Sequence, residues 1–151
     1  MTFSERASDV PAGAHCILVV DSEVLIRMVI AQYLRDCGYR VIEAVSAEEA
    51  LTILNHPELA VDVVLSDVEQ GGPMDGFGLA QWARANKPGV TVVLAASATR
   101  AAGIAADLCE ASPLLSRPYD RQVLLDRIKR STAGRVSASP AAEADDKGAM
   151  T

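Results

Sequence analysis

The chain has 151 residues and a formal net charge of −6, and half of its residues are apolar while few are aromatic. This length suits one domain with a core of its own, built mainly from Val, Leu, Ile and Ala. The acidic balance argues against a nucleic-acid surface and against adhesion to anionic membranes, so the expected partner is a protein.

The first half of the chain predicts two β–α units after a polar, disordered tail at 1–14. The apolar run 16–20 stops at Asp21, as a strand buried on both faces does. Ser22 stands as an N-cap before a helical pattern that stops at Gly38. A second strand is expected at 39–45, and a second helix from a capping box at 46–49 to Pro57.

The second half predicts three more β–α units. The third strand ends in Asp67, and a Gly-Gly-Pro break precedes a helix capped by Asp75. The expected strands are 61–67, 90–95 and 114–115, and the expected helices are about 77–87, 98–111 and 120–130. A second disordered tail at 132–151 leaves the folded domain at 15–131.

Three cysteines lie far apart and form no CxxC pair: Cys16, Cys37 and Cys109. We expect reduced thiols in a reducing compartment, with Cys16 and Cys37 in the core, and neither a disulfide nor a zinc site. The sequence shows no signal peptide and no apolar run of the roughly 18–20 residues that span a bilayer. The expected location is therefore cytoplasmic, with His15 and His56 as surface residues.

Five β–α units in a row predict a doubly wound α/β fold, in which helices cover both faces of a parallel sheet. Ligands of such folds bind beyond the carboxyl ends of the strands. The candidate site residues are therefore those that end the apolar runs: Asp21, Ser22, Asp67, Ala96, Ser97 and Arg117.

Two strands end in an acid, Asp21 and Asp67. Carboxylates in close contact raise one another's proton affinity, so such a pair calls for a cation. Mg²⁺ takes oxygen ligands and often binds one or two carboxylates together with phosphate oxygens. An Asp carboxylate is also a nucleophile towards phosphoryl groups, and a cation such as Arg117 offsets their charge.

Three stretches resemble the landmark motifs of the receiver domains of two-component response regulators: ILVVDSEVLIR, VVLSDVEQGGPMDGFGLA and LLSRPYD. The resemblance runs from about Cys16 to Arg130. It implies a flavodoxin-like receiver fold, with a five-stranded parallel sheet in the order 2-1-3-4-5 and five helices. It also implies that Asp67 accepts a phosphoryl group from a sensor histidine kinase or a histidine phosphotransfer protein. Asp21 and the backbone carbonyl of Glu69 would then help Asp67 to hold Mg²⁺.

Several positions depart from the family pattern. Ser22 replaces the second acid, so weak Mg²⁺ binding is expected unless Glu23 reaches inward. Ala96 stands where the family has Ser or Thr, and Ser97 beside it is either a phosphoryl contact or the cap of the next helix. In addition, Arg117 replaces a Lys, Leu114 replaces a switch aromatic, and the loop after Asp67 carries one extra residue.

The leading functional hypothesis is a stand-alone receiver domain in a phosphorelay, which is not an enzyme and acts on a downstream protein by contact. The alternative is a pseudo-receiver, a binding module that works without efficient phosphorylation. Two other classes fit poorly. A haloacid-dehalogenase-like phosphatase has an Asp-x-Asp strand end, and neither 21–23 nor 67–69 has this pattern. A flavodoxin-like cofactor binder fits no better, because the acids at 21–23 would repel the phosphate of the cofactor.

The fourth and fifth β–α units also predict a homodimer. The helix at 98–111 is rich in small residues, and the last helix offers Arg121, Asp126, Arg127 and Lys129. Like surfaces of this kind can meet across a two-fold axis with their charges crossing reciprocally. Receiver domains often pair through this region, so the resemblance points the same way.

Overall fold

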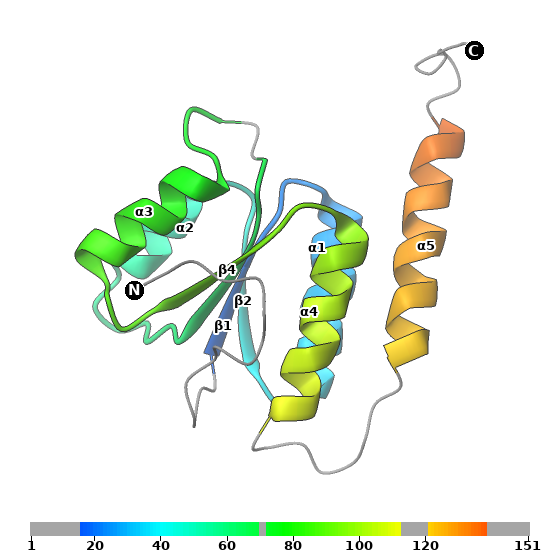
Figure 1. The fold of residues 1–151 in the computed structure, drawn as a ribbon, viewed down its shortest axis with the longest axis horizontal. Helices are drawn as coiled ribbons and strands as arrows, with labels where there is room; N and C mark the ends of the chain where they lie inside the picture. Colours follow the sequence, from blue (N-terminus) through cyan, green and yellow to red (C-terminus); the bar gives the residue numbers. More distant parts are fainter. Residues whose placement is uncertain (1–15, 70–71, 113–120, 139–151) are drawn as a thin grey trace.

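A parallel four-stranded sheet lies between two layers of helices (Figure 1). The structure is a computed structural model, and it describes residues 16–69, 72–112 and 121–138. The elements in chain order are β1 (Cys16–Val20), α1 (Val24–Asp36), β2 (Arg40–Ala44), α2 (Ala47–Leu54), β3 (Val63–Asp67), α3 (Gly76–Asn86), β4 (Thr91–Ala95), α4 (Ala98–Ala111) and α5 (Arg121–Ala138). The predicted alternation of strands and helices is confirmed for these residues.

The strands pair in the order β2-β1-β3-β4, as predicted for the first four. The fifth predicted strand, at 114–115, lies outside the described residues. The register pairs Val20 with Ser66 and Asp67 with Ala95, so β1, β3 and β4 end at the same edge of the sheet.

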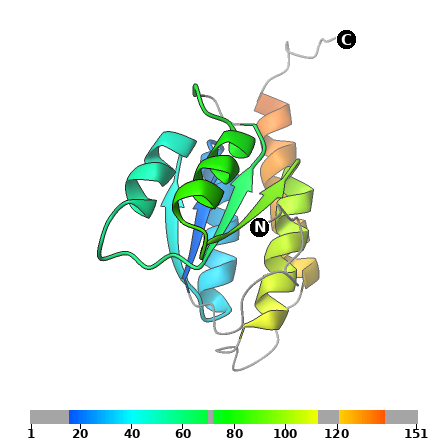
Figure 2. The same cartoon turned by 60° about the vertical axis from the view of Figure 1, so that its left-hand side comes forward.

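Successive side chains of the strands enter two separate cores. Ile17 and Val19 of β1 pack with α1, α4 and α5, whereas Leu18 and Val20 pack with α2 and α3. Figure 2 shows the two helix layers on opposite faces of the sheet. Because helices cover both faces, β1 is apolar throughout and β3 and β4 are apolar along most of their length, and this explains the continuous apolar runs of the sequence.

The helix caps follow local sequence signals. The Ser46 hydroxyl accepts from the Glu49 N–H at 3.1 Å, and the Glu49 carboxylate accepts from the Val45 N–H at 2.8 Å, so the predicted capping box is present in a slightly shifted form. Asp75 caps α3 by accepting from the backbone N–H of its third following residue at 2.8 Å. Gly38 follows α1 with φ of 103°, a left-handed conformation that glycine adopts without strain.

Two helix boundaries differ from the prediction. The N-cap of α1 is Glu23, because its carbonyl accepts the first helical hydrogen bond, from the Arg27 N–H at 2.9 Å, and Ser22 is exposed one residue earlier. Helix α5 ends at Ala138 instead of near Arg130, since each residue added to an existing helix gains a hydrogen bond at little further cost. Within the described segments, no helix combines the length and apolarity needed to cross a bilayer.

The prediction of three reduced thiols is wrong for two of the cysteines. Cys37, the C-cap of α1, and Cys109 of α4 form a disulfide, with Cα atoms 5.3 Å apart. The two residues are 72 positions apart, so no local spacing signals the bond. It forms because α1 and α4 pack side by side in the same core. Cys16 keeps a free thiol, buried in the core on the other face of the sheet.

Candidate functional site

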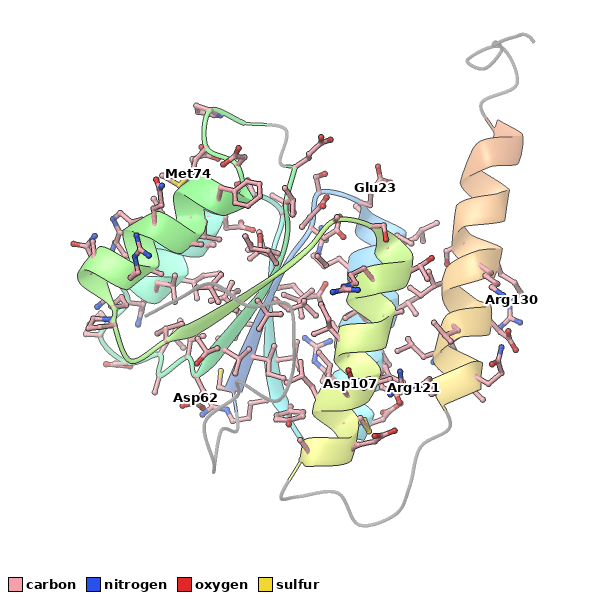
Figure 3. All side chains as sticks on the ribbon, in the orientation of Figure 1. Glu23, Asp62, Met74, Asp107, Arg121 and Arg130 are labelled. Carbon is pink, nitrogen blue, oxygen red and sulfur yellow. A yellow bond between two sulfur atoms is a disulfide. The ribbon has the colours of Figure 1, made fainter. Side chains whose placement is uncertain are left out.

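The carboxyl ends of β1, β3 and β4 surround a cavity of about 180 Å³. The residues that line it include six candidates from the sequence: Asp21, Glu23, Asp67, Glu69, Ala96 and Ser97. In Figure 3, Glu23 lies at this end of the sheet and Asp62 lies at the opposite end. Parallel pairing in the observed register thus brings the predicted strand-end residues into one site.

Asp21 is a buried carboxyl group, with 8% of its surface exposed. Its Oδ1 accepts from the Glu23 N–H at 2.8 Å, and its backbone carbonyl accepts from the Arg27 guanidinium at 2.9 Å. The pKa of Asp21 is raised to about 6, and burial is the largest cause. The hydrogen bond from the Glu23 N–H and the charge of Arg27 lower this pKa, whereas the charges of Asp67 and Glu23 raise it. The charged form of Asp21 is therefore poorly compensated in this cavity.

Asp67 ends β3 and is half-buried at the cavity. Its Oδ1 accepts from the Glu69 N–H at 3.4 Å. Burial raises the pKa of this carboxyl group, hydrogen bonds from the Glu69 and Val68 N–H groups lower it, and the charges of Glu69 and Glu23 raise it. Negative charge is thus concentrated around both aspartates, an arrangement that a bound cation would offset.

Of the two residues that follow Asp21, Glu23 lines the cavity and Ser22 does not. The Ser22 side chain is exposed. The Asp21 carboxylate closes the turn after β1, because it accepts a hydrogen bond from the backbone N–H of Glu23. This geometry selects the longer acid at position 23, which the sequence left as one of two options.

The loop after Asp67 approaches it closely. A Cβ atom at Gly76 would lie 2.3 Å from the backbone oxygen of Asp67, so only glycine fits this position. The Gly76 N–H donates to the Val68 carbonyl at 2.8 Å, and the Met74 N–H donates to the Glu48 carboxylate at 3.1 Å. Gly76 and Glu48 therefore position the segment between Asp67 and α3. Sequence reasoning missed both roles, although the Asp-Gly pair at the start of α3 is part of the second family-like motif.

The N-terminal end of α4 forms another wall of the cavity. Ala96 presents a methyl group there, and Ser97 caps α4 by accepting from the Arg100 N–H at 3.1 Å. The capping role foreseen for Ser97 is thus present. The same hydroxyl still has a hydrogen to donate, because capping uses it as an acceptor. Two other predicted contacts, Leu114 and Arg117, lie outside the described residues.

The donor groups of the site suit a hard divalent cation. Carboxylate and carbonyl oxygens are the ligands of Mg²⁺, which keeps several waters and needs only one or two protein carboxylates. Among residues 16–69, 72–112 and 121–131, no three acidic, His or Cys side chains converge into a full metal cage. Asp21 and Asp67 therefore fit a largely hydrated Mg²⁺ ion.

The raised pKa of Asp21 predicts a pH-dependent stability in the absence of divalent cations. Between its ordinary pKa of 3.8 and the folded value of about 6, the folded protein holds a proton that the unfolded chain has released. Stability therefore falls as pH rises through this window, by at most about 3 kcal/mol. Asp21→Asn keeps an acceptor for the Glu23 N–H and lacks the titration.

Urea unfolding in EDTA measures this effect. From pH 4 to pH 7 the wild type should lose about 2–3 kcal/mol relative to Asp21→Asn. A constant difference between the two proteins over this range would contradict the predicted protonation of Asp21.

A sequence model of the response regulator receiver domain family matches residues 17–129. The chain therefore belongs to this family, whose members are the receiver domains of two-component response regulators. The resemblance of the three motifs is confirmed, and so is the flavodoxin-like α/β class of the fold.

Curated relatives are longer than this chain. It is 34% identical over 116 residues to the probable transcriptional regulator ycf27 of Cyanophora paradoxa, which is 75% of this chain and 46% of that protein. It is 36% identical over 89 residues to the sensor kinase CckA of Brucella abortus (strain 2308), which is 59% of this chain and 9% of that protein. The chain thus spans less than half the length of each of these two relatives.

Solved receiver domains share the fold. The signal receiver domain of an HD domain-containing protein from Pseudomonas fluorescens Pf-5 has a TM-score of 0.51 and 28% identity, covering 82% of this chain and 98% of that one. A CheY-like receiver domain protein from Methanospirillum hungatei JF-1 has a TM-score of 0.51 and 23% identity, covering 84% and 100%.

Proposed function

We propose that this receiver domain accepts a phosphoryl group on Asp67 and signals by protein–protein contact within a phosphorelay. The observation that carries the proposal is the shared cavity of Asp67 and Asp21 at the strand ends. In the transfer, a carboxylate oxygen of Asp67 attacks phosphorus, the bond from phosphorus to the donor's histidine nitrogen breaks, and that nitrogen takes up a proton. The domain is then a substrate and a signal carrier, and not an enzyme.

A Mg²⁺ ion held by Asp21, Asp67 and the Glu69 backbone carbonyl is part of the proposal. The ion, when bound, neutralises charge on the phosphoryl oxygens. We propose that Glu23 supplies the acid that Ser22 lacks, through an intervening water, because Glu23 lines the cavity. The affinity for Mg²⁺ remains weak, since a longer and exposed side chain is a poorly preorganised partner.

The role of Glu23 gives a prediction with a neighbouring control. Glu23→Gln should weaken Mg²⁺ binding about tenfold, because it removes a charge that acts on both aspartates. Ser22→Ala should leave the affinity unchanged, because the Ser22 side chain is exposed away from the cavity lining. Isothermal titration with Mg²⁺ measures both, and a loss of affinity in Ser22→Ala alone would reverse the assignment.

The phosphoryl group needs donors at the α4 side of the cavity. Ala96 has no hydroxyl, so we propose that Ser97 donates to a phosphoryl oxygen while it caps α4. Arg117 would add a cation and Leu114 would replace the switch aromatic, as the family pattern implies.

A protein donor has to approach the edge of the sheet where Asp67 lies. Exposed apolar side chains surround this edge: Val24, Leu25 and Met28 on the first turns of α1, and Phe77 on the first turn of α3. Exposed apolar side chains on both sides of a charged cavity suit a protein partner. We therefore propose a sensor histidine kinase or histidine phosphotransfer protein as donor and a downstream protein as target, in the cytoplasm, with neither nucleic acid nor membrane as a partner.

Incubation with Mg²⁺ and acetyl phosphate, followed by intact-mass measurement, tests the proposal. A mass gain of one phosphoryl group supports phosphorylation, and no gain supports the alternative, a pseudo-receiver binding module. Three features of the sequence favour that alternative: Ser22 in place of an acid, Ala96 in place of a hydroxyl residue and Leu114 in place of the switch aromatic.

We also propose a homodimer through α4 and α5. Arg121 pairs with Asp107 and Glu110 of its own chain, and Asp126 accepts from the Gln122 amide at 2.9 Å. Asp126, Arg127 and Lys129 are exposed near Val123, which is 47% exposed, and can pair across a two-fold axis. Light scattering over a range of concentrations should give about twice the 15.9 kDa mass of the chain. A mass of one chain at every concentration, with and without phosphodonor, would disprove the dimer.

A further inference from the structure

The Cys37–Cys109 disulfide joins two helices of the layer that contains α4. Cys37 caps the C-terminal end of α1, and Cys109 lies near the C-terminal end of α4. Both sulfur-bearing residues are buried in the same core, and Cys16 is buried on the other face of the sheet. Exchange between Cys16 and the pair would require unfolding, so the disulfide is a self-contained pair.

The C-terminal half of α4 is held at several points. Besides the disulfide, the buried Tyr39 hydroxyl donates to the Leu108 carbonyl at 2.7 Å. Arg121 of α5 pairs with Asp107, a contact between two residues labelled in Figure 3. These contacts attach this half of the helix to α1, to the start of β2 and to α5.

The N-terminal half of the same helix forms the wall of the acidic cavity. Ala98 and Ala101 line that cavity, and Cys109 follows Ala101 by about 12 Å along the helix axis. One helix therefore connects the disulfide to the site.

Helix α4 packs into the core mainly through small side chains. Its buried residues are mostly alanines, with Ile104 and Leu108 as the larger ones. Small side chains bury little apolar area, so packing contributes less per residue than in a helix rich in leucine. Gly103, in the middle of α4, has open space where a Cβ would stand, so no neighbour requires a glycine there, and glycine loosens a helix. The disulfide thus adds a covalent restraint to a helix that packs mainly through small side chains.

We propose that Cys37 and Cys109 form a redox site that controls the mobility of α4 and, through it, the cavity around Asp67. The redox role rests on the cytoplasmic location proposed above, because disulfides in reducing compartments are usually redox-sensing or catalytic. The chain also belongs to a signalling family. Because both cysteines are buried, the step begins with a local opening of the C-terminal end of α4. A dithiol reductant then attacks one sulfur, forms a mixed disulfide and resolves it by its second thiol. Two electrons and two protons pass to Cys37 and Cys109, and the reductant becomes the disulfide. Oxidation by a disulfide-bonded partner reverses the step.

Hydrogen exchange of the oxidised and the dithiol-reduced protein, followed by mass spectrometry, tests the proposal. Labelling for seconds to minutes reports local opening instead of global unfolding. Peptides of α4 and of the C-terminal end of α1 should exchange at least about tenfold faster after reduction, while α2 and α3 stay unchanged. Equal exchange of α4 in both states, or the same acceleration in α2 and α3, would overturn the proposal.

Matched variants assign the effect to the pair. Cys16→Ala keeps the disulfide and should respond to the dithiol as the wild type does. Cys37→Ala/Cys109→Ala should show fast α4 exchange with and without the dithiol. If the double variant fails to fold, the comparison of the two redox states of the wild type still decides the question.

Acetyl phosphate labelling should also be faster in the oxidised state, because the rim at Ser97 is then held in place. The exchange measurement does not depend on that labelling, so it tests this proposal even if Asp67 is never phosphorylated.

Discussion

Asp67→Asn should reduce phosphoryl incorporation from acetyl phosphate to background. The amide that replaces the carboxylate has no nucleophilic oxygen of comparable strength, so the acyl phosphate cannot form. Asp67 is the acid that ends β3 at the cavity, so no other carboxylate should take over at the same rate. Intact-mass measurement after incubation with Mg²⁺ and acetyl phosphate reads the result directly.

Asp75→Asn is the matched control for this experiment. Asp75 lies in the same loop and caps α3, and asparagine caps a helix as well as aspartate does, so the fold should persist. Phosphoryl incorporation should persist too. Label retained in Asp67→Asn would show that Asp67 is not the acceptor. Label lost in Asp75→Asn as well would show that the loss is not specific to Asp67.

Reduction of the Cys37–Cys109 disulfide should lower the free energy of unfolding by about 2–4 kcal/mol. The bond closes a loop between residues 72 positions apart, and a long closed loop restricts the unfolded chain strongly. Since a domain of this size is stable by only about 5–15 kcal/mol, the change is a large fraction of the total. Urea titration with and without a dithiol measures it.

The response to the dithiol should depend on the pair alone. It should persist in Cys16→Ala, whose disulfide is intact, and vanish in Cys37→Ala/Cys109→Ala. Identical urea midpoints for the oxidised and reduced wild type would contradict the prediction and would leave the disulfide without a part in stability.

Several elements of the fold could be predicted because their causes are local. Apolar runs predicted the four described strands, Ser46 and Asp75 predicted the starts of α2 and α3, and Gly38 predicted the end of α1. A cap or a strand depends on residues within a few positions of it. Asp21 and Asp67 could be selected as site residues for the same reason, since each directly follows an apolar run.

What the tertiary structure decided depends on contacts between distant segments. The pairing of Cys37 with Cys109 requires α1 and α4 to pack on the same face, and nothing in the spacing of the two cysteines indicates it. Whether Glu23 or Ser22 lines the cavity depends on how the turn after β1 meets the neighbouring strands. The raised pKa of Asp21 is a result of burial, and burial exists only once the sheet and its helices surround that carboxyl group.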